Sequence, residues 1–279
     1  MELRFTKMHG CGNDYVYIST FSQTVDNFSF LAKTLSDRHF GIGGDGVIFI
    51  CPSEVADVQM RMFNEDGSEG KMCGNGVRCV AKFAYDHGLV SGDAVRVETL
   101  SGIKEVKLSF EDECVVGAVV DMGQAILTPG AIPVSFDGER LIDVPYVFGG
   151  IEYRISCVGM GNPHCVTFVE DVEQVDLSAI GPIFERAEMF PERVNTEFVQ
   201  VIDSTHLKMR VWERGSGETF ACGTGACACV VAAVENGYCP KGMPIKVSLR
   251  GGDLIITYRD DVVLMEGPAV AVYEGVCRI

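Results

Sequence analysis

The chain lacks any apolar run long enough to cross a membrane, because its longest runs, such as "VIFI" and "LIITY", have the length of strands. Its first ten residues, "MELRFTKMHG", lack the apolar region and the cleavage pattern of a signal peptide. We therefore expect a cytoplasmic protein. In that compartment its twelve cysteines are reduced, so a disulfide framework is not expected.

Basic residues are scarce as well. The sequence holds 23 Lys and Arg against 39 Asp and Glu, a formal net charge of −16. Such a surface repels phosphate backbones and anionic lipids, which argues against nucleic acid or membranes as partners. With 279 residues, 47% of them apolar, the chain is nevertheless long enough to form two domains with sizeable cores.

Signatures of metals and cofactors are also missing. The cysteines form no C-x-x-C pair and the sequence has no H-E-x-x-H, so no bound metal is expected. The stretch "GIGGDG", residues 41–46, fits the dinucleotide pattern, but it follows a predicted helix and enters a strand, the reverse of a pyrophosphate-binding turn. We therefore expect no cofactor, and we interpret most other cysteines, including Cys51, Cys114 and Cys277, as small buried apolar residues.

What the sequence does contain is a repeat. The stretches "MCGNGVRC" and "ACGTGACAC" each place a cysteine directly before a Gly-x-Gly turn, at Cys73 and Cys222. Shifting the chain by 149 positions aligns these cysteines and makes 13 of 80 positions identical between residues 9–88 and 158–237. Chance would give about five identities. Because the identities gather on Gly, Asn and Cys, we infer two copies of one unit.

Each copy predicts the same elements. A strand after a Gly-x-Gly-Asn turn precedes an amphipathic helix (29–40 and 178–190), further strands, and a second helix of about fifteen residues that ends at Gly88 or Gly237. The second helices are apolar on most faces, which is typical of a buried helix. We predict a mixed α/β protein of two pseudo-symmetric domains, each a barrel-like sheet around a central helix, with the active site in the cleft between them. The predicted domains are residues 1–121 with 268–279, and residues 122–267, and the segment "TPGAIPVSFDG" is the expected crossover.

A cysteine at a helix start lies beside free backbone N–H groups and the positive end of the helix dipole. Both are expected to lower its thiol pKa. Two such thiols, one from each domain, suit the inversion of a carbon centre, in which one thiolate removes a proton and the opposite thiol supplies another. This chemistry needs neither a metal nor pyridoxal phosphate.

Six ordered motifs then resemble one family from end to end: "KMHGCGNDYVYI", "RHFGIGGDGVIF", "FNEDGSEGKMCGNGVRC", "GMGNPHCVTFV", "RVNTEFVQV" and "RVWERGSGETFACGTGACA". Together they are similar to the diaminopimelate epimerases. The resemblance implies a cofactor-independent isomerase that interconverts LL- and meso-diaminopimelate, in lysine and peptidoglycan precursor synthesis. It also implies a homodimer.

The resemblance assigns roles to residues at matching positions. Cys73 and Cys222 would be the catalytic pair, assisted by His164 and Glu213. The implied substrate-binding residues are Asn13, Asn64, Gly74, Asn75, Asn162, Asn195, Glu213, Arg214, Gly223 and Thr224. Arg214 would pair with a substrate carboxylate, and Tyr273 resembles a dimer-contact tyrosine. Gly46 departs from the pattern, because many relatives carry a substrate-contacting glutamine there.

Two alternatives are weighed against this interpretation. One is a related proline-type amino-acid racemase or isomerase on the same scaffold. The racemases considered carry "MCGHG" where this chain has "MCGNG". The other is a non-enzymatic thiol redox or metal-binding protein, which predicts the C-x-x-C pairs that the sequence lacks. If Cys73 and Cys222 face one carbon atom, they are also expected to form a disulfide when oxidised.

Overall fold

The computed structural model describes residues 2–279, and the chain divides into two compact units. The first comprises Met1–Asp121 with Glu266–Ile279, and the second comprises Met122–Met265. The chain passes between them within strands β8 (Cys114–Gln124) and β17 (Val262–Pro268). The expected crossover, residues 128–138, lies inside the second unit instead, because continuous strands make the connection. Among residues 2–279, no helix combines the length and apolar character that a membrane span requires.

The first unit is a single mixed sheet with two helices. Its elements in chain order are β1 (Glu2–Gly10), β2 (Asn13–Ser19), α1 (Phe28–Ser36), β3 (Gly46–Cys51), β4 (Val58–Asn64), β5 (Glu69–Gly70), α2 (Gly74–Asp86), β6 (Ala94–Thr99), β7 (Gly102–Glu111), β8 and, from the C-terminus, β18 (Val270–Arg278).

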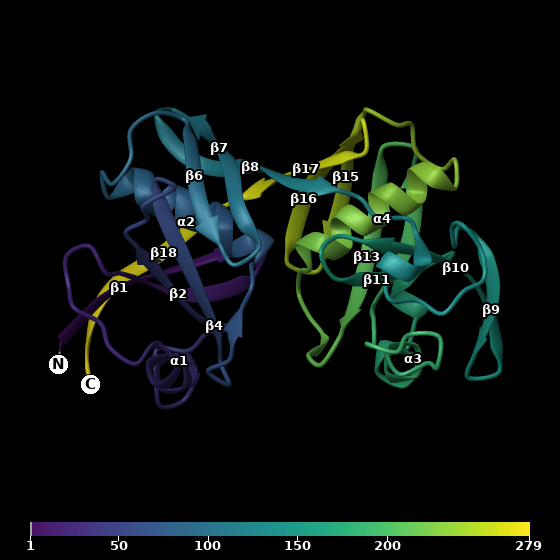
Figure 1. Ribbon diagram of the computed structural model, residues 1–279, viewed down its shortest axis with the longest axis horizontal. Coiled ribbons are helices and arrows are strands. Elements are labelled where there is room, and N and C mark those ends of the chain that lie inside the picture. The colour runs from purple at the N-terminus through teal and green to yellow at the C-terminus, as the bar shows by residue number, and fades with distance from the viewer. Residues whose placement is uncertain (1) are drawn as a thin grey trace. The chain divides into compact units, whose positions relative to one another are not determined.

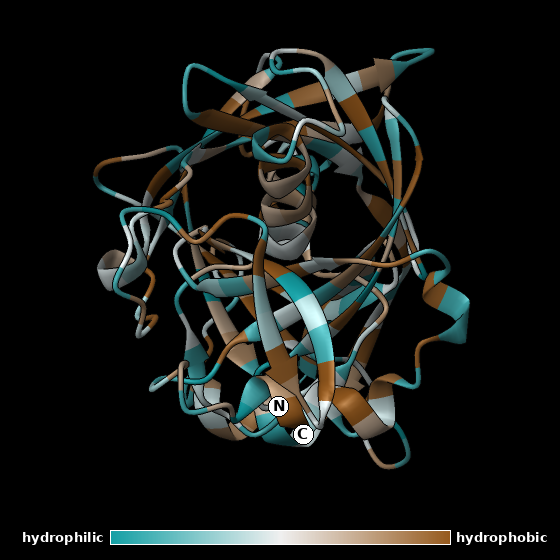
Figure 2. Ribbon diagram, turned by 90° about the vertical axis from the view of Figure 1, so that its right-hand side faces the viewer, coloured by the Kyte–Doolittle hydropathy of each residue, from teal (hydrophilic) through white to brown (hydrophobic). Residues whose placement is uncertain are grey.

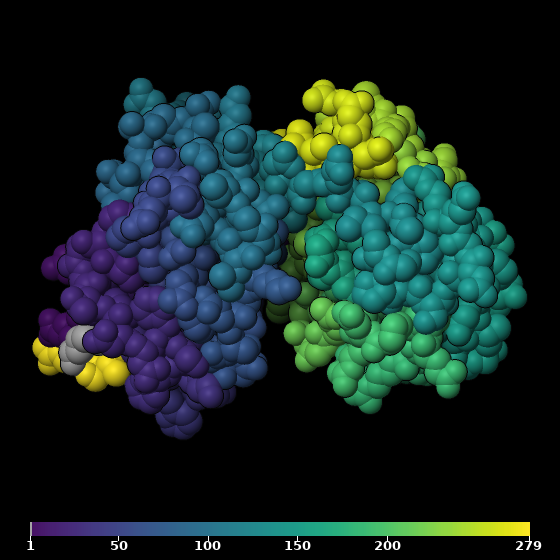
Figure 3. All heavy atoms as spheres, in the orientation of Figure 1, coloured from purple at the N-terminus to yellow at the C-terminus, as the bar shows by residue number. Residues whose placement is uncertain are grey.

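The pairing of these strands brings the sheet back on itself. Strand β18 pairs antiparallel with β1, as Figures 1 and 3 show by the yellow segment beside the purple one. The order continues through β2, β3, β4, β6, β7 and β8, with parallel pairs at β2–β3 and β4–β6. The Ala269 N–H then donates to the Val116 carbonyl at 3.1 Å. Strand β8 therefore returns to the segment from which β18 begins.

The second unit repeats this plan. Its elements are η1 (Pro129–Ala131), β9 (Val144–Phe148), β10 (Ile151–Gly159), β11 (Pro163–Phe168), η2 (Val172–Gln174), α3 (Leu177–Glu185), β12 (Asn195–Asp203), β13 (His206–Glu213), β14 (Gly217–Glu218), α4 (Gly223–Glu235), β15 (Pro244–Leu249), β16 (Gly252–Arg259) and β17.

The strand register of the two units agrees with the 149-residue repeat. In the parallel pair β2–β3, Tyr15 lies opposite Gly46, and in the parallel pair β11–β12, His164 lies opposite Asn195. Strand β9 adds to β10 as β18 adds to β1. The predicted mixed α/β fold, made twice, is therefore confirmed.

The central helices α2 and α4 each have 13 residues and begin directly after Cys73 and Cys222. Val77, Val80 and Ala84 of α2, at helical spacing, are fully buried. All but one of the first eleven residues of α4 are buried, and Figure 2 shows strands passing around a helix coloured mainly white to brown. The helices end at Asp86 and Glu235, two residues before the predicted stop positions Gly88 and Gly237, whose φ angles of 66° and 78° favour glycine.

The outer helices α1 and α3 begin at side-chain caps, since Asn27 accepts a hydrogen bond from Phe30 N–H and Asp176 accepts one from Ala179 N–H. Both are shorter than predicted. Helix α1 ends at Ser36 because Asp37 leaves the helical backbone region, with ψ at 123°, and its carboxylate accepts hydrogen bonds from the N–H groups of His39 and Phe40.

Two of the cysteines interpreted as buried packing residues are placed differently. Cys51 is buried, but Cys114 is exposed and Cys277 only partly buried. Cys114 begins β8, where exposed and buried positions alternate, and Cys277 lies on β18, none of whose residues is fully buried.

Candidate active site

Cys73 is the N-cap residue of α2 and has extended backbone. The N–H of Gly76 donates to its Sγ atom at 3.3 Å, and the Sγ atom lies 3.1 Å from Oδ1 of Asn13. Asn13 opens β2, so the first glycine turn and the cysteine turn meet in this unit. The Cys73 side chain is half-buried.

Cys222 holds the equivalent place before α4. The N–H of Gly225 donates to its Sγ atom at 3.4 Å, and the Thr224 hydroxyl lies 3.5 Å from it. Unlike Cys73, it is buried, with 6% of its surface exposed. Gly74 and Gly223 are the first residues of the two helices, whose N–H groups there have no partner within the helix.

The second glycine of each turn is required by packing. A Cβ atom on Gly76 would lie 2.7 Å from Cδ1 of Ile48, and one on Gly225 would lie 2.6 Å from Oε1 of Glu197. Close approach of the helix start to a strand therefore explains these glycines.

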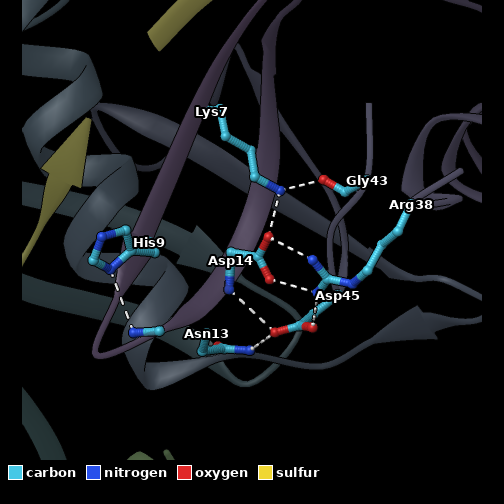
Figure 4. A network of polar contacts seen from close by, with 8 residues as sticks. Lys7, His9, Asn13, Asp14, Arg38, Gly43 and Asp45 are labelled. Carbon is cyan, nitrogen blue, oxygen red and sulfur yellow. Dashed lines mark hydrogen bonds and ion pairs between the residues drawn. The ribbon is translucent and has the colours of Figure 1, made fainter. Parts of the chain in front are cut away.

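A polar network extends from Asn13 in the first unit (Figure 4). Its Nδ2 donates to Asp45 at 2.7 Å, while Arg38 binds both Asp14, at 2.7 Å, and Asp45, at 2.9 Å. Lys7 pairs with Asp14 at 2.6 Å. Although burial opposes them, the hydrogen bonds from Arg38 and Lys7 lower the pKa of the Asp14 carboxyl.

The second unit holds a buried histidine–carboxylate pair. Nδ1 of His164 lies 2.6 Å from Oε1 of Glu197, and both side chains are fully buried. Nε2 of the same ring lies 2.9 Å from Oδ1 of Asn162. Both ring nitrogens therefore lie within hydrogen-bond distance of a side-chain oxygen, which fixes the orientation of the ring.

Glu213, at the end of β13, adjoins Cys222. Its carboxylate accepts a hydrogen bond from the Thr219 hydroxyl. Burial raises the pKa of Glu213, opposed by hydrogen bonds with Thr219 and Cys222. Burial and then the charges of Glu213 and Glu197 raise the pKa of the Cys222 thiol. The expected lowering by the helix start is therefore wrong for Cys222, because desolvation and two nearby carboxylates outweigh the Gly225 N–H.

Asn195 and Arg214 are joined through the backbone. Asn195 is buried, donates to the Pro163 carbonyl at 3.0 Å and accepts from the Arg214 N–H at 2.9 Å. This amide ties the starts of β11 and β12 to the end of β13. The Arg214 side chain is exposed and donates from Nη1 to the Glu192 carbonyl at 2.8 Å.

The two remaining asparagines of the first unit differ in exposure. Asn64 is partly exposed and donates to the Ser68 hydroxyl at 3.0 Å. Asn75 is buried, and its Oδ1 accepts from Nη2 of the fully buried Arg78 at 3.1 Å. Arg78 also donates to the Gly74 carbonyl at 3.2 Å, which fixes the first turn of α2.

The structure explains Gly46 and places Tyr273 at the surface. A Cβ atom on Gly46 would lie 2.1 Å from the Phe63 carbonyl oxygen, so the backbone of β4 leaves no room there for a side chain. Tyr273 lies on β18, is 46% exposed, and contacts the edge of the Phe5 ring.

Two polar residues that contact the predicted site residues, Glu197 and Asp45, were not predicted from the sequence. Glu197 is the one acidic residue within the apolar stretch "TEFVQV", which was the available signal. Asp45 lies in the glycine-rich stretch 41–46, for which only a dinucleotide site was considered and rejected. Among residues 2–279, no three His, Cys, Asp or Glu side chains are grouped as metal ligands.

Comparisons with known proteins agree with the sequence motifs. The diaminopimelate epimerase family model matches residues 5–128 and 156–272. The chain is 54% identical over 275 residues to the diaminopimelate epimerase of Acetivibrio thermocellus, covering 98% of both chains. It is 53% identical over 283 residues to that of Desulfovibrio desulfuricans, covering 99% of this chain and 98% of the relative.

Solved structures share the fold at low identity. A PhzF-family phenazine biosynthesis protein of Bacillus anthracis aligns with a TM-score of 0.73 at 16% identity over 100% of both chains. A hydroxyproline epimerase from Agrobacterium vitis aligns with a TM-score of 0.73 at 12% identity, covering 99% of this chain and 92% of that one. These two show the fold alone. From the family model and the curated relatives, the chain belongs to the diaminopimelate epimerase family.

Proposed function

We propose that this protein epimerises LL-diaminopimelate to meso-diaminopimelate, with Cys73 and Cys222 as the acid–base pair. The observation that carries the proposal is the twin placement of the two thiols. Each is the N-cap residue of a buried helix at the same position of its unit. Each sulfur accepts a hydrogen bond from the backbone N–H of the residue three positions later. Family membership names the substrate.

The reaction balances with two thiols and no other reactant. One sulfur, as thiolate, takes the proton from the α-carbon, and the C–H electron pair stays on carbon as a carbanion conjugated with the carboxylate. The opposite thiol then donates its proton to the other face, which leaves the configuration inverted and the two sulfurs with exchanged protonation. The N–H groups at the starts of α2 and α4 are suited to stabilise the negative charge of the substrate carboxylate.

The second unit supplies groups that assist Cys222. Because burial raises the pKa of Glu213, its carboxylate is a suitable acceptor for the thiol proton beside it. His164, hydrogen-bonded to Glu197 at one ring nitrogen and to Asn162 at the other, links the polar groups on this side of the site. In the first unit the hydrogen-bond partner of the thiol is the Asn13 amide.

Substrate recognition is assigned to the polar residues around these turns. Arg214 donates from Nη1 to a backbone carbonyl. The other N–H groups of its exposed guanidinium can donate to a substrate carboxylate. The partly exposed amides of Asn13, Asn64 and Asn162, with the turn residues Gly74, Asn75, Gly223 and Thr224, would contact the rest of the molecule. Asn195 would not contact the substrate but would position Arg214 through the hydrogen bond that its side chain accepts from the Arg214 N–H.

We further propose a cytoplasmic homodimer that acts in lysine and peptidoglycan precursor synthesis without a cofactor. The exposed side chains of β18 support the dimer. Val272, Tyr273 and Val276 are 56%, 46% and 60% exposed, and apolar groups on an outer strand favour contact with a second copy. Approach of the two thiols to one carbon atom also predicts a Cys73–Cys222 disulfide under mild oxidation, reversed by added thiol.

Exchange in heavy water tests the function. The reduced protein is incubated with LL-diaminopimelate in heavy water, and both deuterium at the α-carbon and formation of the meso isomer are followed. We expect both for the unaltered protein, and a loss of epimerisation of about 10²–10⁴-fold for Cys73→Ser and Cys222→Ser, since serine is a far weaker acid and base. Cys114→Ser, at an exposed cysteine, is the matched control with unchanged activity. Absence of exchange with folded, reduced protein rejects the proposal.

A further inference from the structure

Asp45 lies next to the candidate site, and neither the motifs nor the family resemblance gave it a role. It stands between two glycines, and its carboxylate Oδ2 accepts from Asn13 Nδ2 at 2.7 Å and from the Asp14 N–H at 3.1 Å. Its Oδ1 accepts from Arg38 at 2.9 Å. Figure 4 shows this carboxylate between Arg38 and the Asn13 amide.

The chemistry of these partners fixes the orientation of the Asn13 amide. An ionised carboxylate only accepts hydrogen bonds, so the NH₂ group of Asn13 must face Asp45. The amide oxygen then faces the other way, toward Cys73 Sγ at 3.1 Å. An amide oxygen also only accepts, so the short contact is satisfied when Cys73 is a thiol and donates its proton. A thiolate in this place would meet the negative end of the amide dipole.

The outer part of the network keeps Asp45 in place. Burial and the charge of Asp14 raise the pKa of the Asp45 carboxyl, opposed by the hydrogen bonds from the Asn13 amide and the Asp14 N–H and by the charge of Arg38. Arg38 bridges Asp45 and Asp14, and Lys7 pairs with Asp14. The Asp45 N–H donates to the Asp14 carbonyl at 2.7 Å, which anchors the backbone of the loop to β2. These contacts immobilise the carboxylate that holds the amide.

We propose that Asp45 is a positioning residue, which holds the Asn13 amide with its oxygen toward Cys73 and so keeps Cys73 in the thiol form in the free protein. The inference rests on the proposed function and deepens it, because it names the residue that sets the protonation state of Cys73 before substrate binds.

The arrangement is specific to the first unit. The residue 149 positions after Asp45 is Val194, which is fully buried and apolar. Asn162, the counterpart of Asn13, has its oxygen on the His164 ring instead. Asp45 therefore has no carboxylate counterpart that orients the amide of Asn162. Different groups determine the protonation of the two thiols.

The test measures the pH dependence of Cys73 alkylation by iodoacetamide in the free protein, since only the thiolate reacts. Trypsin cleaves after Lys71 and Arg78, so the peptide 72–78 carries Cys73 as its single cysteine and reports it by mass spectrometry. In Asp45→Asn, the new amide has both a donor and an acceptor, and the Asn13 amide is free to turn its NH₂ group toward sulfur. We expect the apparent pKa of Cys73 to fall by about one unit.

A double-mutant cycle separates this mechanism from the loss of a nearby charge. In the Asn13→Ala background, Asp45→Asn is expected to leave the Cys73 profile unchanged, because no amide remains to be oriented. Asp45→Ala, which removes the acceptor without adding a donor, must show the same dependence on Asn13 and serves where Asp45→Asn fails to fold. Asp93→Asn, at an exposed carboxylate 4.0 Å from Lys107, is the control.

Two results overturn the proposal: no shift in Asp45→Asn, or an equal shift with and without Asn13, which would mean a direct effect of charge. Neither depends on substrate. If the protein epimerises diaminopimelate but either of these results is obtained, only the role of Asp45 is rejected. If the shift depends on Asn13 but the protein does not epimerise diaminopimelate, only the proposed function is rejected.

Discussion

Around Cys73 the polar neighbours are an amide and the carboxylate that holds it, whereas around Cys222 they are two carboxylates and a buried imidazole. The backbone of the two sites is nevertheless the same. Each cysteine is an extended N-cap whose sulfur accepts an N–H three residues later. The repeat thus preserves the turn that presents the sulfur, while side chains set the electrostatics of each sulfur separately.

Equivalent positions show where the units diverge. Glu197, fully buried beside His164, corresponds to the apolar Ile48 of the first unit, and Glu213 corresponds to Asn64. The second unit therefore places charge on the strands that face its helix start. In the first unit the equivalent strand positions carry no charge, and the charged residues near Cys73 form the network of Lys7, Asp14, Arg38 and Asp45. Exchanging residues between equivalent positions tests whether this difference is functional or tolerated.

The largest effect is expected from Glu197→Ile, which gives the second unit the residue of the first. Removing the carboxylate leaves the buried Nδ1 of His164 without its hydrogen-bond partner and is expected to cost about 3 kcal/mol. Ile48→Val, the control at the equivalent position, is expected to cost about 0.5–1.5 kcal/mol. Trp212, the single tryptophan, lies in the second unit, so urea unfolding followed by its fluorescence reports that unit. A cost below about 1 kcal/mol for Glu197→Ile contradicts a stabilising pair.

An intermediate effect is expected from the arginines that the repeat conserves. Arg210 binds Glu218 through two nitrogens and also donates to the carbonyls of Val172 and Val175, each at 2.9 Å. Its equivalent, Arg61, binds Glu69 and is more exposed, at 37% against 16% of the side chain. Arg210→Met is expected to cost about 2 kcal/mol, because two carbonyls lose a charged donor.

Arg61→Met is the matched variant. It loses a surface ion pair and the contacts of the guanidinium with two phenylalanine rings, and is expected to cost under about 1 kcal/mol. Urea unfolding followed by far-UV circular dichroism measures both variants. Equal costs for the two would mean that the carbonyl contacts of Arg210 add nothing to its ion pair.

The repeat and the glycine turns predicted the fold because they constrain the backbone. Gly88 and Gly237 mark the ends of the central helices, and Cys73 and Cys222 mark their starts. Asp45 and Glu197 were not predicted, because their importance comes from partners more than thirty residues away in the sequence, Asn13 and His164. The expected low pKa of Cys222 was wrong for the same reason. The helix start is local and visible in the sequence, whereas burial and the neighbouring carboxylates depend on the packing of strands.

The smallest effect, and one of opposite sign, is expected from Glu213→Gln. Burial raises the pKa of Glu213 above its usual 4.5 in the folded protein. The stability that the neutral carboxyl contributes is fully present below about 4.5 and is lost as the pH rises through the raised folded pKa. Glutamine stays neutral, as Asn64 does in the first unit. The variant is therefore expected to gain stability relative to the unaltered protein between pH 4 and pH 8, while epimerisation is lost.

Glu218→Gln is the control with the opposite slope. Hydrogen bonds from Arg210 lower the pKa of Glu218, so the stability that its ionised form contributes is present above about 4.5 and is lost as the pH falls through the lowered pKa. This variant is expected to lose stability at pH 8 and to approach the unaltered protein in acid. Urea unfolding followed by Trp212 fluorescence at several pH values measures both. Parallel slopes for the two variants would mean that the Glu213 site does not penalise charge, and that the raised thiol pKa of Cys222 has another origin.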